Sequence, residues 1–397
     1  MSAQLELSVV FPCLDEAETI AECIQQAKKV MEDASIEGEV VVADNGSTDG
    51  SQEIATKEGG RVVDVEDKGY GNALFGGFSA AKGKYIIHMD SDLSYPISEI
   101  PRYVEELRKG ADLVMGSRLT PQMEPGAMPF THRYLGTPVL TGLANLFFSC
   151  GIKDINCGMR GLTKEAFHRM DLRTGGMEFA SEMVIKAALM KMKIAQFPIP
   201  FKKDKRGRPP HLKSFRDGWR HLRFQLLFSP TWLFFLPGLL LLLAGVATIG
   251  AIIYGLEPRI GLTTALLAQS AVSAGVLAML FGVAAQGFAH VKQLHHGALS
   301  RLYNWIELEK GIVLGLIFML AGAGVLGWSF YQISNFMDQP GYQVGQFNPG
   351  ATKMAVVGAT LFITGIQILF ASFFLSLFKI ETVMARKPAA ESSPKEQ

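Results

Sequence analysis

The sequence predicts an α/β domain built on a doubly wound, mostly parallel sheet, followed by an α-helical transmembrane domain of four helices. Charge patterning is the first observation behind this prediction. Residues 1–223 hold 59 of the 75 Asp, Glu, Lys and Arg residues, whereas residues 224–397 hold 16. The second observation is that short apolar runs alternate with helical segments in the charged part. A chain that is 48% hydrophobic is too apolar for a fully soluble enzyme, and a net charge of +1 disfavours a nucleic-acid partner.

Five apolar runs of β type predict the strands of the first domain. In chain order they are Leu7–Pro12, Glu39–Asp44, Arg61–Val65, Tyr85–Asp90 and Asp112–Gly116. The segments between them, such as Glu16–Met31, have helical periodicity. Strands that are buried on both faces and alternate with helices form a parallel sheet, and such sheets bind ligands beyond the carboxyl ends of their strands.

Four charge-free stretches after Arg223 predict the membrane helices, near 232–254, 263–288, 311–332 and 355–378. Each stretch exceeds the ~20 apolar residues that a spanning helix needs. Nine Lys and Arg residues lie in 202–223 and more follow in 289–310 and in the tail, while the two other loops have one each. The positive-inside rule therefore predicts an inner or plasma membrane protein whose first domain and both termini are cytoplasmic. An N-terminus without a signal-peptide pattern fits this orientation.

The cysteines carry no metal-binding spacing. Cys13, Cys23, Cys150 and Cys157 include no C-x-x-C pair, and no His lies at zinc-finger distance. We interpret them as reduced packing residues.

Acidic residues follow three of the predicted strands. Asp15 follows the first strand, Asp44 ends the second, and Asp90 and Asp92 end the fourth in the string D-S-D. Two carboxylates this close at a strand end can hold a hard divalent cation, which can bridge the phosphates of a nucleotide. D-x-D by itself is common in turns and helix caps. Its position after a predicted buried strand is what favours a cation site here.

The order of these motifs resembles family 2 glycosyltransferases of the GT-A fold. The strings are P-C-L-D-E-A, V-V-A-D-N-G-S-T-D-G, K-G-Y-G-N-A-L, Y-I-I-H-M-D-S-D and D-L-V-M-G-S-R. With four helices after them, the chain is similar to the polyprenyl-phosphate glycosyltransferases, which include dolichyl-phosphate mannose synthase and the bactoprenyl-phosphate glucosyltransferases. The resemblance implies inverting transfer of a hexose from a UDP- or GDP-sugar to undecaprenyl or dolichyl phosphate, which yields a lipid-linked sugar for cell-envelope glycosylation.

The resemblance also implies a nucleotide-sugar site and a metal site. The nucleotide-sugar residues would be Pro12, Asp15, Glu16, Asp44, Asn45, Lys68, Gly69, Gly71, Asp90, Arg206, His211 and Lys213. Asn45 stands where a second Asp is common, and the last three residues belong to a loop that only imperfectly matches R-x-x-G-x-S-K. Mg²⁺ or Mn²⁺ would be held by Asp90, Asp92 and Ser94. The alternative for Gly69 and Gly71 is an ordinary loop before a helix.

On the acceptor side, the resemblance assigns the lipid phosphate to Arg118, His132 and Arg133. Arginine binds phosphate through two parallel hydrogen bonds. The catalytic set would be Asp92, Arg118 and Arg133, with surface charge as the alternative for the arginines and a bystander role as the alternative for His132. For Glu178 and Glu182 we favour a structural role at a helix start.

The implied domains are a GT-A catalytic domain at 1–214, a juxtamembrane amphipathic helix at 215–230, the four-helix membrane domain at 231–380 and a disordered cytoplasmic tail at 381–397. Within the first, the charge-free segment 134–150 is too short to span a membrane. We expect an interfacial helix that holds the acceptor, with burial in the domain core as the alternative.

The chemistry needs no strong base, because a prenyl phosphate is already an anion at neutral pH. Most of the catalysis should therefore come from alignment of the reactants and from stabilisation of charge. Three alternatives are left open: transfer to another lipid such as a diacylglycerol or ceramide-like alcohol, a processive polysaccharide synthase, and an inactive scaffold or flippase component. The synthase usually carries Q-x-x-R-W, which is absent here. The sugar, the donor base, the lipid length, and a homo-oligomeric or flippase partner are also left open.

Overall fold

The computed structural model describes residues 5–205, 214–254, 261–291, 307–343, 346 and 348–385. The chain divides into two compact units, Met1–Phe228 and Ser229–Gln397.

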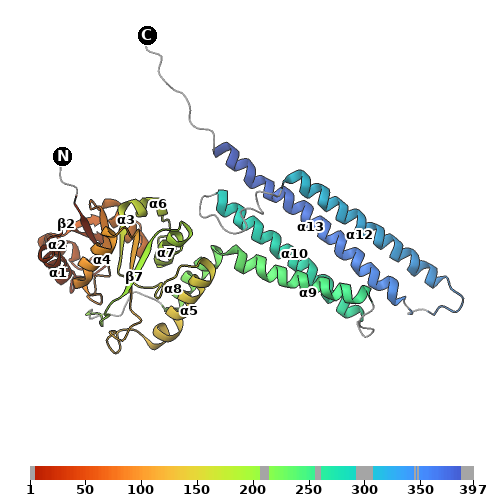
Figure 1. Ribbon diagram of the computed structural model, residues 1–397, viewed down its shortest axis with the longest axis horizontal. Helices are drawn as coiled ribbons and strands as arrows, with labels where there is room; N and C mark the ends of the chain where they lie inside the picture. Colours follow the sequence, from red (N-terminus) through yellow and green to blue (C-terminus); the bar gives the residue numbers. More distant parts are fainter. Residues whose placement is uncertain are drawn as a thin grey trace, which may run out of the picture. The chain divides into compact units, whose positions relative to one another are not determined.

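The first unit is built on a seven-stranded sheet of order β3-β2-β1-β4-β6-β5-β7 (Figure 1). The strands are β1 Leu7–Cys13, β2 Gly38–Asp44, β3 Arg61–Asp64, β4 Tyr85–His88, β5 Leu113–Ser117, β6 Arg160–Thr163 and β7 Ile194–Pro198. All pairings are parallel except those of β6, which runs antiparallel to both β4 and β5. The prediction of a mostly parallel α/β sheet is confirmed. Strand β4 ends at His88, two residues before Asp90, where the sequence predicted its end.

Eight α-helices accompany the sheet in the described part of the first unit. They are α1 Ile20–Asp33, α2 Ser51–Lys57, α3 Tyr70–Ala80, α4 Ile100–Arg108, α5 Thr137–Phe148, α6 Lys164–Met170, α7 Phe179–Leu189 and α8 Ser214–Leu227. In α1 the buried side chains Ile20, Cys23, Ile24, Ala27 and Met31 recur at helical spacing, so one face of the helix packs on the sheet.

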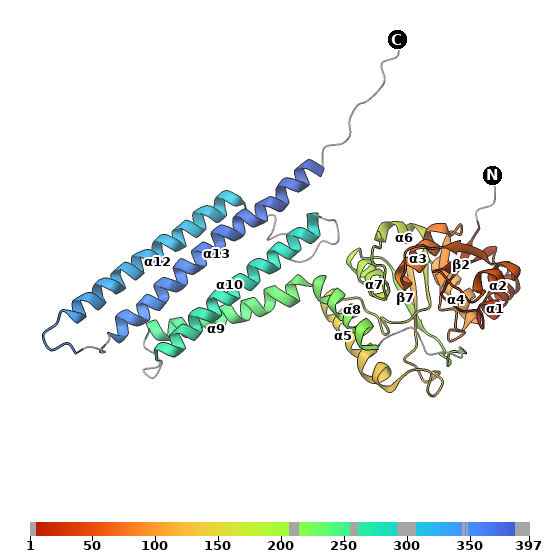
Figure 2. The same cartoon turned by 180° about the vertical axis from the view of Figure 1, so that it is seen from behind.

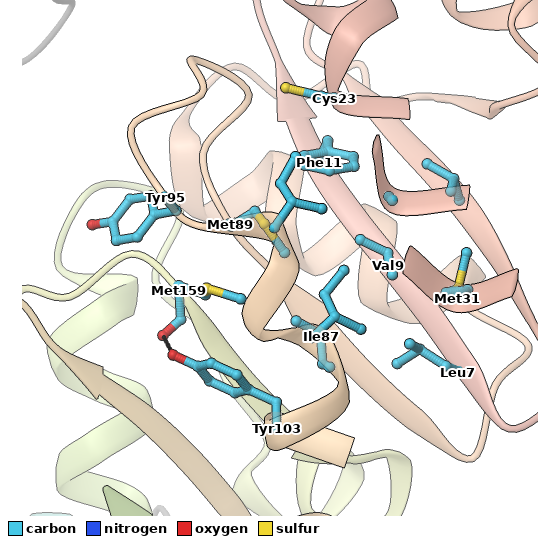
Figure 3. Close-up of a cluster of buried hydrophobic side chains, with 14 of the residues drawn as sticks. Leu7, Val9, Phe11, Cys23, Met31, Ile87, Met89, Tyr95, Tyr103 and Met159 are labelled. Atoms are coloured by element: carbon cyan, nitrogen blue, oxygen red, sulfur yellow. Dashed lines mark hydrogen bonds between the residues drawn. The ribbon is translucent and has the colours of Figure 1, made fainter. Parts of the chain in front are cut away.

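Alternation along the strands sends side chains to two cores. Val9 and Phe11 of β1 enter the core that α1 and α4 cover, whereas Val10 between them enters the core formed with α3, α5, α6 and α7. Figure 3 shows part of the first core, where the Tyr103 hydroxyl donates a hydrogen bond to the Met159 carbonyl at 3.1 Å. All four cysteines are free and buried, as expected for packing residues.

The second unit consists of long apolar helices (Figure 2). They are α9 Leu236–Ile253, preceded by a π-helical turn at Thr231–Phe235, α10 Leu262–Val291, α12 Leu308–Met337 and α13 Pro349–Ala385. Among the residues that the structure describes, four helices are long and apolar enough to cross a membrane: Thr231–Ile253, Leu262–Ala289, Leu308–Met337 and Pro349–Leu377. The prediction of four such helices is confirmed.

Small residues set the close packing of α12 against α13. A Cβ atom on Gly322 would lie 2.5 Å from the Phe362 backbone nitrogen and 2.7 Å from the Gly358 carbonyl oxygen. Only glycine permits this approach, and close backbone contact is a main source of helix association in lipid.

Candidate functional site

The carboxyl ends of β1, β2 and β4 surround a cavity of about 500 Å³, here called the first cavity. Because neighbouring parallel strands end at the same edge of a sheet, residues far apart in sequence meet there. Six of the expected nucleotide-sugar residues line it: Pro12, Glu16, Asn45, Lys68, Gly69 and Asp90. Asp15, Asp44 and Gly71 do not line it. Arg206, His211 and Lys213 lie outside the described residues.

Asn45 joins two loops at the floor of this cavity. Its Nδ2 donates to the carbonyl oxygens of Val65 and Asp67, at 3.0 and 2.8 Å, and its Oδ1 accepts from the Gly69 amide at 2.7 Å. The Lys68 ammonium donates to the Asn45 carbonyl at 2.7 Å. An ionised Asp could accept the Gly69 bond but could not donate the other two. This explains why an amide serves here where a second Asp is common.

Asp44 lies just behind the cavity wall and is fully buried. Its Oδ2 accepts hydrogen bonds from the amides of Gly46 and Ser47 and from Gln52 Nε2, at 2.9, 3.0 and 2.6 Å. Burial disfavours the charged form, but hydrogen bonds from Ser47, Gln52 and Gly46 outweigh it and lower the pKa of Asp44. Asp15, which has a positive φ of 56°, accepts from the Thr48 amide at 2.8 Å. Both carboxylates therefore order the loops after β1 and β2.

The start of α3 packs tightly against a loop at residues 174–177. A Cβ on Gly69, whose φ is +140°, would collide with the Gly175 carbonyl oxygen, and one on Gly71 would lie 2.5 Å from the Thr174 oxygen. Glu182 fixes this loop, since its Oε2 accepts from the Thr174 amide and hydroxyl at 2.9 and 2.7 Å. These contacts fit the structural role that we favoured for Glu182. Met177 of this loop also lines the cavity, although no motif in the sequence marked it.

The D-S-D string follows β4 at the centre of the site. Asp90 lines the first cavity and also the second cavity described below, and its Oδ1 accepts from the Tyr70 hydroxyl at 2.9 Å. Asp92 is buried and lines neither cavity, and its Oδ1 accepts from the amide and hydroxyl of Ser94 at 3.0 and 2.6 Å. Ser94 Oγ is thus engaged with Asp92.

A divalent cation fits the donor set of this string. Carboxylate oxygens are hard ligands, and Mg²⁺ is commonly bound through one or two carboxylates together with substrate phosphates. Within the described ranges no cluster of three or more His, Cys, Asp or Glu side chains is arranged to hold a metal. The protein's share of such a site would therefore be the pair Asp90 and Asp92.

A second cavity, of about 250 Å³, adjoins the first and has Tyr70, Asp90, Met177 and Asp217 in common with it. Arg118 and His132 line it. Arg118 is buried, and it holds Asp154 through Nε to Oδ2 at 2.8 Å and through Nη2 to Oδ1 at 3.1 Å. Its Nη1 lies 3.3 Å from the Tyr95 hydroxyl. The guanidinium fork expected on a lipid phosphate is therefore occupied by Asp154, which the sequence did not single out.

His132 and Arg133 lie on a π-helical turn, His132–Gly136, that leads into α5. Burial, and after it the Arg118 charge, lower the pKa of His132. Arg133 lines neither cavity, and its guanidinium lies over the Tyr134 ring, 5.3 Å from the centroid. The structure thus places His132 with Arg118 at the second cavity and Arg133 outside it.

Segment 134–150 has one buried and one exposed face. Leu140, Ala144 and Phe148 of α5 pack in the core, whereas Tyr134 and Leu135 are exposed. Phe130, Val139 and Leu146 are also exposed, which makes an apolar surface on this part of the first unit.

Helix α8 supplies site residues that our sequence reasoning missed. Asp217 lines both cavities, Arg216 and Arg220 line the first, and His221 lines the second. His221 Nδ1 is 2.7 Å from Ser181 Oγ, and burial lowers the pKa of His221 to about 4. The available signal was the i, i+4 spacing of the two arginines, but their place in a basic juxtamembrane segment favoured a topology role.

Two family models match separate parts of this chain. Residues 8–170 match the family described as glycosyl transferase family 2, and residues 283–379 match the glycosyltransferase family 2 C-terminal transmembrane region. The chain is 36% identical over 381 residues to the low-salt glycan biosynthesis hexosyltransferase Agl6 of Haloferax volcanii, which covers 93% of this chain and 88% of that protein.

Two further likenesses cover the first unit. A dolichyl-phosphate hexose transferase of Haloferax volcanii is 29% identical over 197 residues, covering 50% of this chain and 83% of that protein. A glucosyl-3-phosphoglycerate synthase from Mycobacterium tuberculosis, solved with Mn²⁺, uridine diphosphate and glucosyl-3-phosphoglycerate, has a TM-score of 0.46 and 23% identity over 57% of this chain and 80% of that one.

Proposed function

Because the chain belongs to glycosyltransferase family 2, we propose that it transfers a hexose, with inversion, from a UDP- or GDP-sugar to the phosphate of a membrane polyprenyl phosphate. The product is a polyprenyl-phosphate sugar that serves as a donor for cell-envelope glycosylation. The observation that carries the proposal is the pair of cavities that share Tyr70, Asp90, Met177 and Asp217. A group transfer needs such a junction, because the anomeric carbon of the donor and the attacking oxygen of the acceptor must be aligned.

The nucleotide sugar occupies the first cavity in this proposal. Its volume of about 500 Å³ lies within the range of small-molecule sites. Asn45, Lys68 and Gly69 form the floor beneath the nucleoside, and Asp90 lies at the diphosphate end. Asp15 and Asp44 support the site by ordering its loops rather than by direct contact.

Asp90 and Asp92 would hold Mg²⁺ or Mn²⁺, which would supply neutralisation of the charge that develops on the leaving nucleoside diphosphate. The Tyr70 hydroxyl, which donates to Asp90 Oδ1 at 2.9 Å, orients that carboxylate toward the cavity junction. Ser94 keeps Asp92 in place through its amide and hydroxyl.

The acceptor phosphate enters the second cavity beside Arg118 and His132. Asp154 fixes the Arg118 guanidinium. The edge that bears Nη1 can therefore bind the acceptor phosphate with little loss of side-chain entropy. An acceptor that is already an anion attacks the anomeric carbon directly, and no protein base has to remove a proton. Arg133, one residue further along the turn, contributes positive charge at the approach to the cavity.

The protein is integral to the membrane, since four apolar helices follow the first unit and match the family's transmembrane region. We propose that the first unit and both termini lie in the cytoplasm, with the exposed apolar side chains around α5 resting on the bilayer. A name such as dolichyl-phosphate hexose transferase, carried by one relative, supports a prenyl-phosphate acceptor.

Radiolabelled sugar transfer tests the proposal. The complete chain in detergent would be incubated with UDP- and GDP-hexoses and Mg²⁺ or Mn²⁺, with undecaprenyl phosphate, dolichyl phosphate or diacylglycerol as acceptor. We expect label in a lipid-phosphate product that mild acid cleaves, and none with Asp90→Asn. Label in diacylglycerol alone would replace the polyprenyl acceptor by another lipid, and label in a growing polymer would indicate a synthase.

A further inference from the structure

The juxtamembrane helix α8 carries two arginines on one face, and their positions indicate that this helix contacts the donor diphosphate. Arg216 and Arg220 are four residues apart, so they lie one turn apart on the same face of α8. Both line the first cavity, together with Lys68 and Asp90. They thus form a cationic wall beside the carboxylate that we assign to the metal.

The two guanidinium groups are anchored through a single buried carboxylate. Asp217 Oδ1 lies 3.3 Å from Arg216 Nε and 3.7 Å from Arg220 Nη1. The Asp217 side chain is 3% exposed, whereas those of Arg216 and Arg220 are 54% and 39% exposed. Each arginine is therefore held at one edge and open to the cavity along the rest of its guanidinium, which carries five N–H donors.

The rest of α8 fixes where these arginines lie. Gln225 Nε2 donates to the Leu140 carbonyl at 3.2 Å, His221 contacts Ser181, and Phe224 is buried in the core with α5 and α7. The helix is thus a packed wall of the first unit. A free juxtamembrane linker that only meets lipid headgroups would not need these contacts.

We propose that Arg216 and Arg220 bind the diphosphate of the donor nucleotide sugar, with Asp217 as the residue that positions them. This inference rests on the proposed function and deepens it by assigning donor recognition to α8, whose last residue, Leu227, lies shortly before the first span at Thr231. Guanidinium groups suit this task, because their planar fork matches two phosphate oxygens at once.

The chain offers a matched control. Arg223 belongs to the same helix and to the same basic segment, yet it lines neither cavity and is exposed. It lies one turn beyond Arg220 on nearly the same face of the helix. A role in membrane orientation or in headgroup binding would involve all three arginines alike, whereas a role in donor binding separates Arg223 from the other two.

Calorimetry on the complete chain in detergent tests the inference with UDP, UMP, GDP and GMP as probes, each with Mn²⁺. For whichever nucleoside diphosphate binds the wild type, we expect Arg216→Gln and Arg220→Gln each to weaken binding about tenfold, since each removes a charge-assisted contact. The matching monophosphate should be affected less, and Arg223→Gln should leave both affinities unchanged. Arg216→Lys and Arg220→Lys should restore part of the diphosphate affinity.

Two outcomes would overturn the inference in distinguishable ways. If the wild type binds UDP or GDP and both glutamine variants bind it equally well, α8 does not contact the diphosphate, although the proposed function stands. If the wild type binds neither nucleotide, the proposed function itself fails. A circular dichroism melt of each variant separates a lost contact from a lost fold. The lysine variants retain the charge, so their diphosphate affinity is a second test of the contact.

Discussion

Arg118 and Asp154 form a buried ion pair with two contacts, Nε to Oδ2 at 2.8 Å and Nη2 to Oδ1 at 3.1 Å, at the wall of the second cavity. The Arg118 amide also donates to Asp154 Oδ2 at 3.1 Å. Burial raises the pKa of Asp154, but the Arg118 charge and its hydrogen bonds outweigh this and lower it. The same arginine thus has a structural partner on one side and a ligand cavity on the other.

We expect Arg118→Ala to destabilise the first unit and to weaken the lipid acceptor. Removing one member of a buried pair costs about 3–5 kcal/mol, because the Asp154 carboxylate stays behind uncompensated. Chemical unfolding should show this loss, and Asp154→Asn should show a loss of similar size. Arg118→Lys, which keeps the charge without the fork, should lose less. A free energy of unfolding that is unchanged in Arg118→Ala would contradict the ion pair with Asp154. An acceptor affinity that is unchanged in Arg118→Lys would show that this arginine does not bind the acceptor phosphate.

Acid should destabilise the first unit through His221 over a defined range. The unfolded chain takes up a proton on this histidine near pH 6.5, whereas the folded chain does so only near pH 4, because burial lowers the pKa. The stability contributed by the neutral ring is therefore complete above pH 6.5 and is lost as the pH falls toward 4, by about 3 kcal/mol in all. Unfolding free energies of wild type and His221→Gln, measured from pH 7 to pH 4, should converge over that window. Curves that stay parallel would show that His221 does not titrate as described.

Asp90 should matter more directly than Asp92 for metal and donor binding, since only Asp90 lines the cavities. We expect Asp90→Asn to abolish Mn²⁺-dependent transfer and to weaken Mn²⁺ binding in the presence of nucleoside diphosphate. Asp92→Asn should also abolish transfer without unfolding the protein. Transfer assays, and titration of Mn²⁺ by electron paramagnetic resonance, measure both effects. Near wild-type turnover in Asp92→Asn would leave Asp90 as the protein's metal ligand.

The two faces of segment 134–150 should respond differently to substitution. Leu135→Gln changes an exposed side chain, so it should lower transfer to polyprenyl phosphate in bilayers while the unfolding free energy stays within about 0.5 kcal/mol. Leu140→Ala, on the buried face, should cost about 2–5 kcal/mol. Nucleotide affinity in Leu135→Gln serves as the control. Full activity of Leu135→Gln in bilayers would argue against an interfacial role for this surface.

Much of the fold could be predicted because its signals are local. The five predicted strands and the four long helices are present, since runs of apolar residues report burial directly. Two strands were missed, β6 inside the sheet and β7 at its edge. β6 reads R-G-L-T and begins with Arg160, which is fully buried and donates to the carbonyl oxygens of Cys157, Ala180 and Ile155. A buried arginine satisfied by backbone oxygens leaves no apolar run to detect.

The site was predictable where it follows a strand and unpredictable where it depends on long-range contact. Asp90 was found because it follows a buried strand, and the ends of parallel strands meet at one edge. Asn45 and Lys68 were implied by the resemblance of their motifs. Asp154, 36 residues from Arg118, and Asp217, on a helix after the last strand, carry no local signal. Their roles arise from packing.

Hydrophobic periodicity and charge act within a few residues, so the two-part organisation, five of the strands and the acidic string after β4 could be predicted from the chain. Which charges have partners depends on the folded structure. Arg118 is fixed by Asp154, Arg216 and Arg220 share Asp217, and Asp92 turns to Ser94 while Asp90 opens to both cavities. The chemistry of an ionic side chain depends on the charges and hydrogen bonds within a few ångströms of it, and folding rather than chain order brings those groups together.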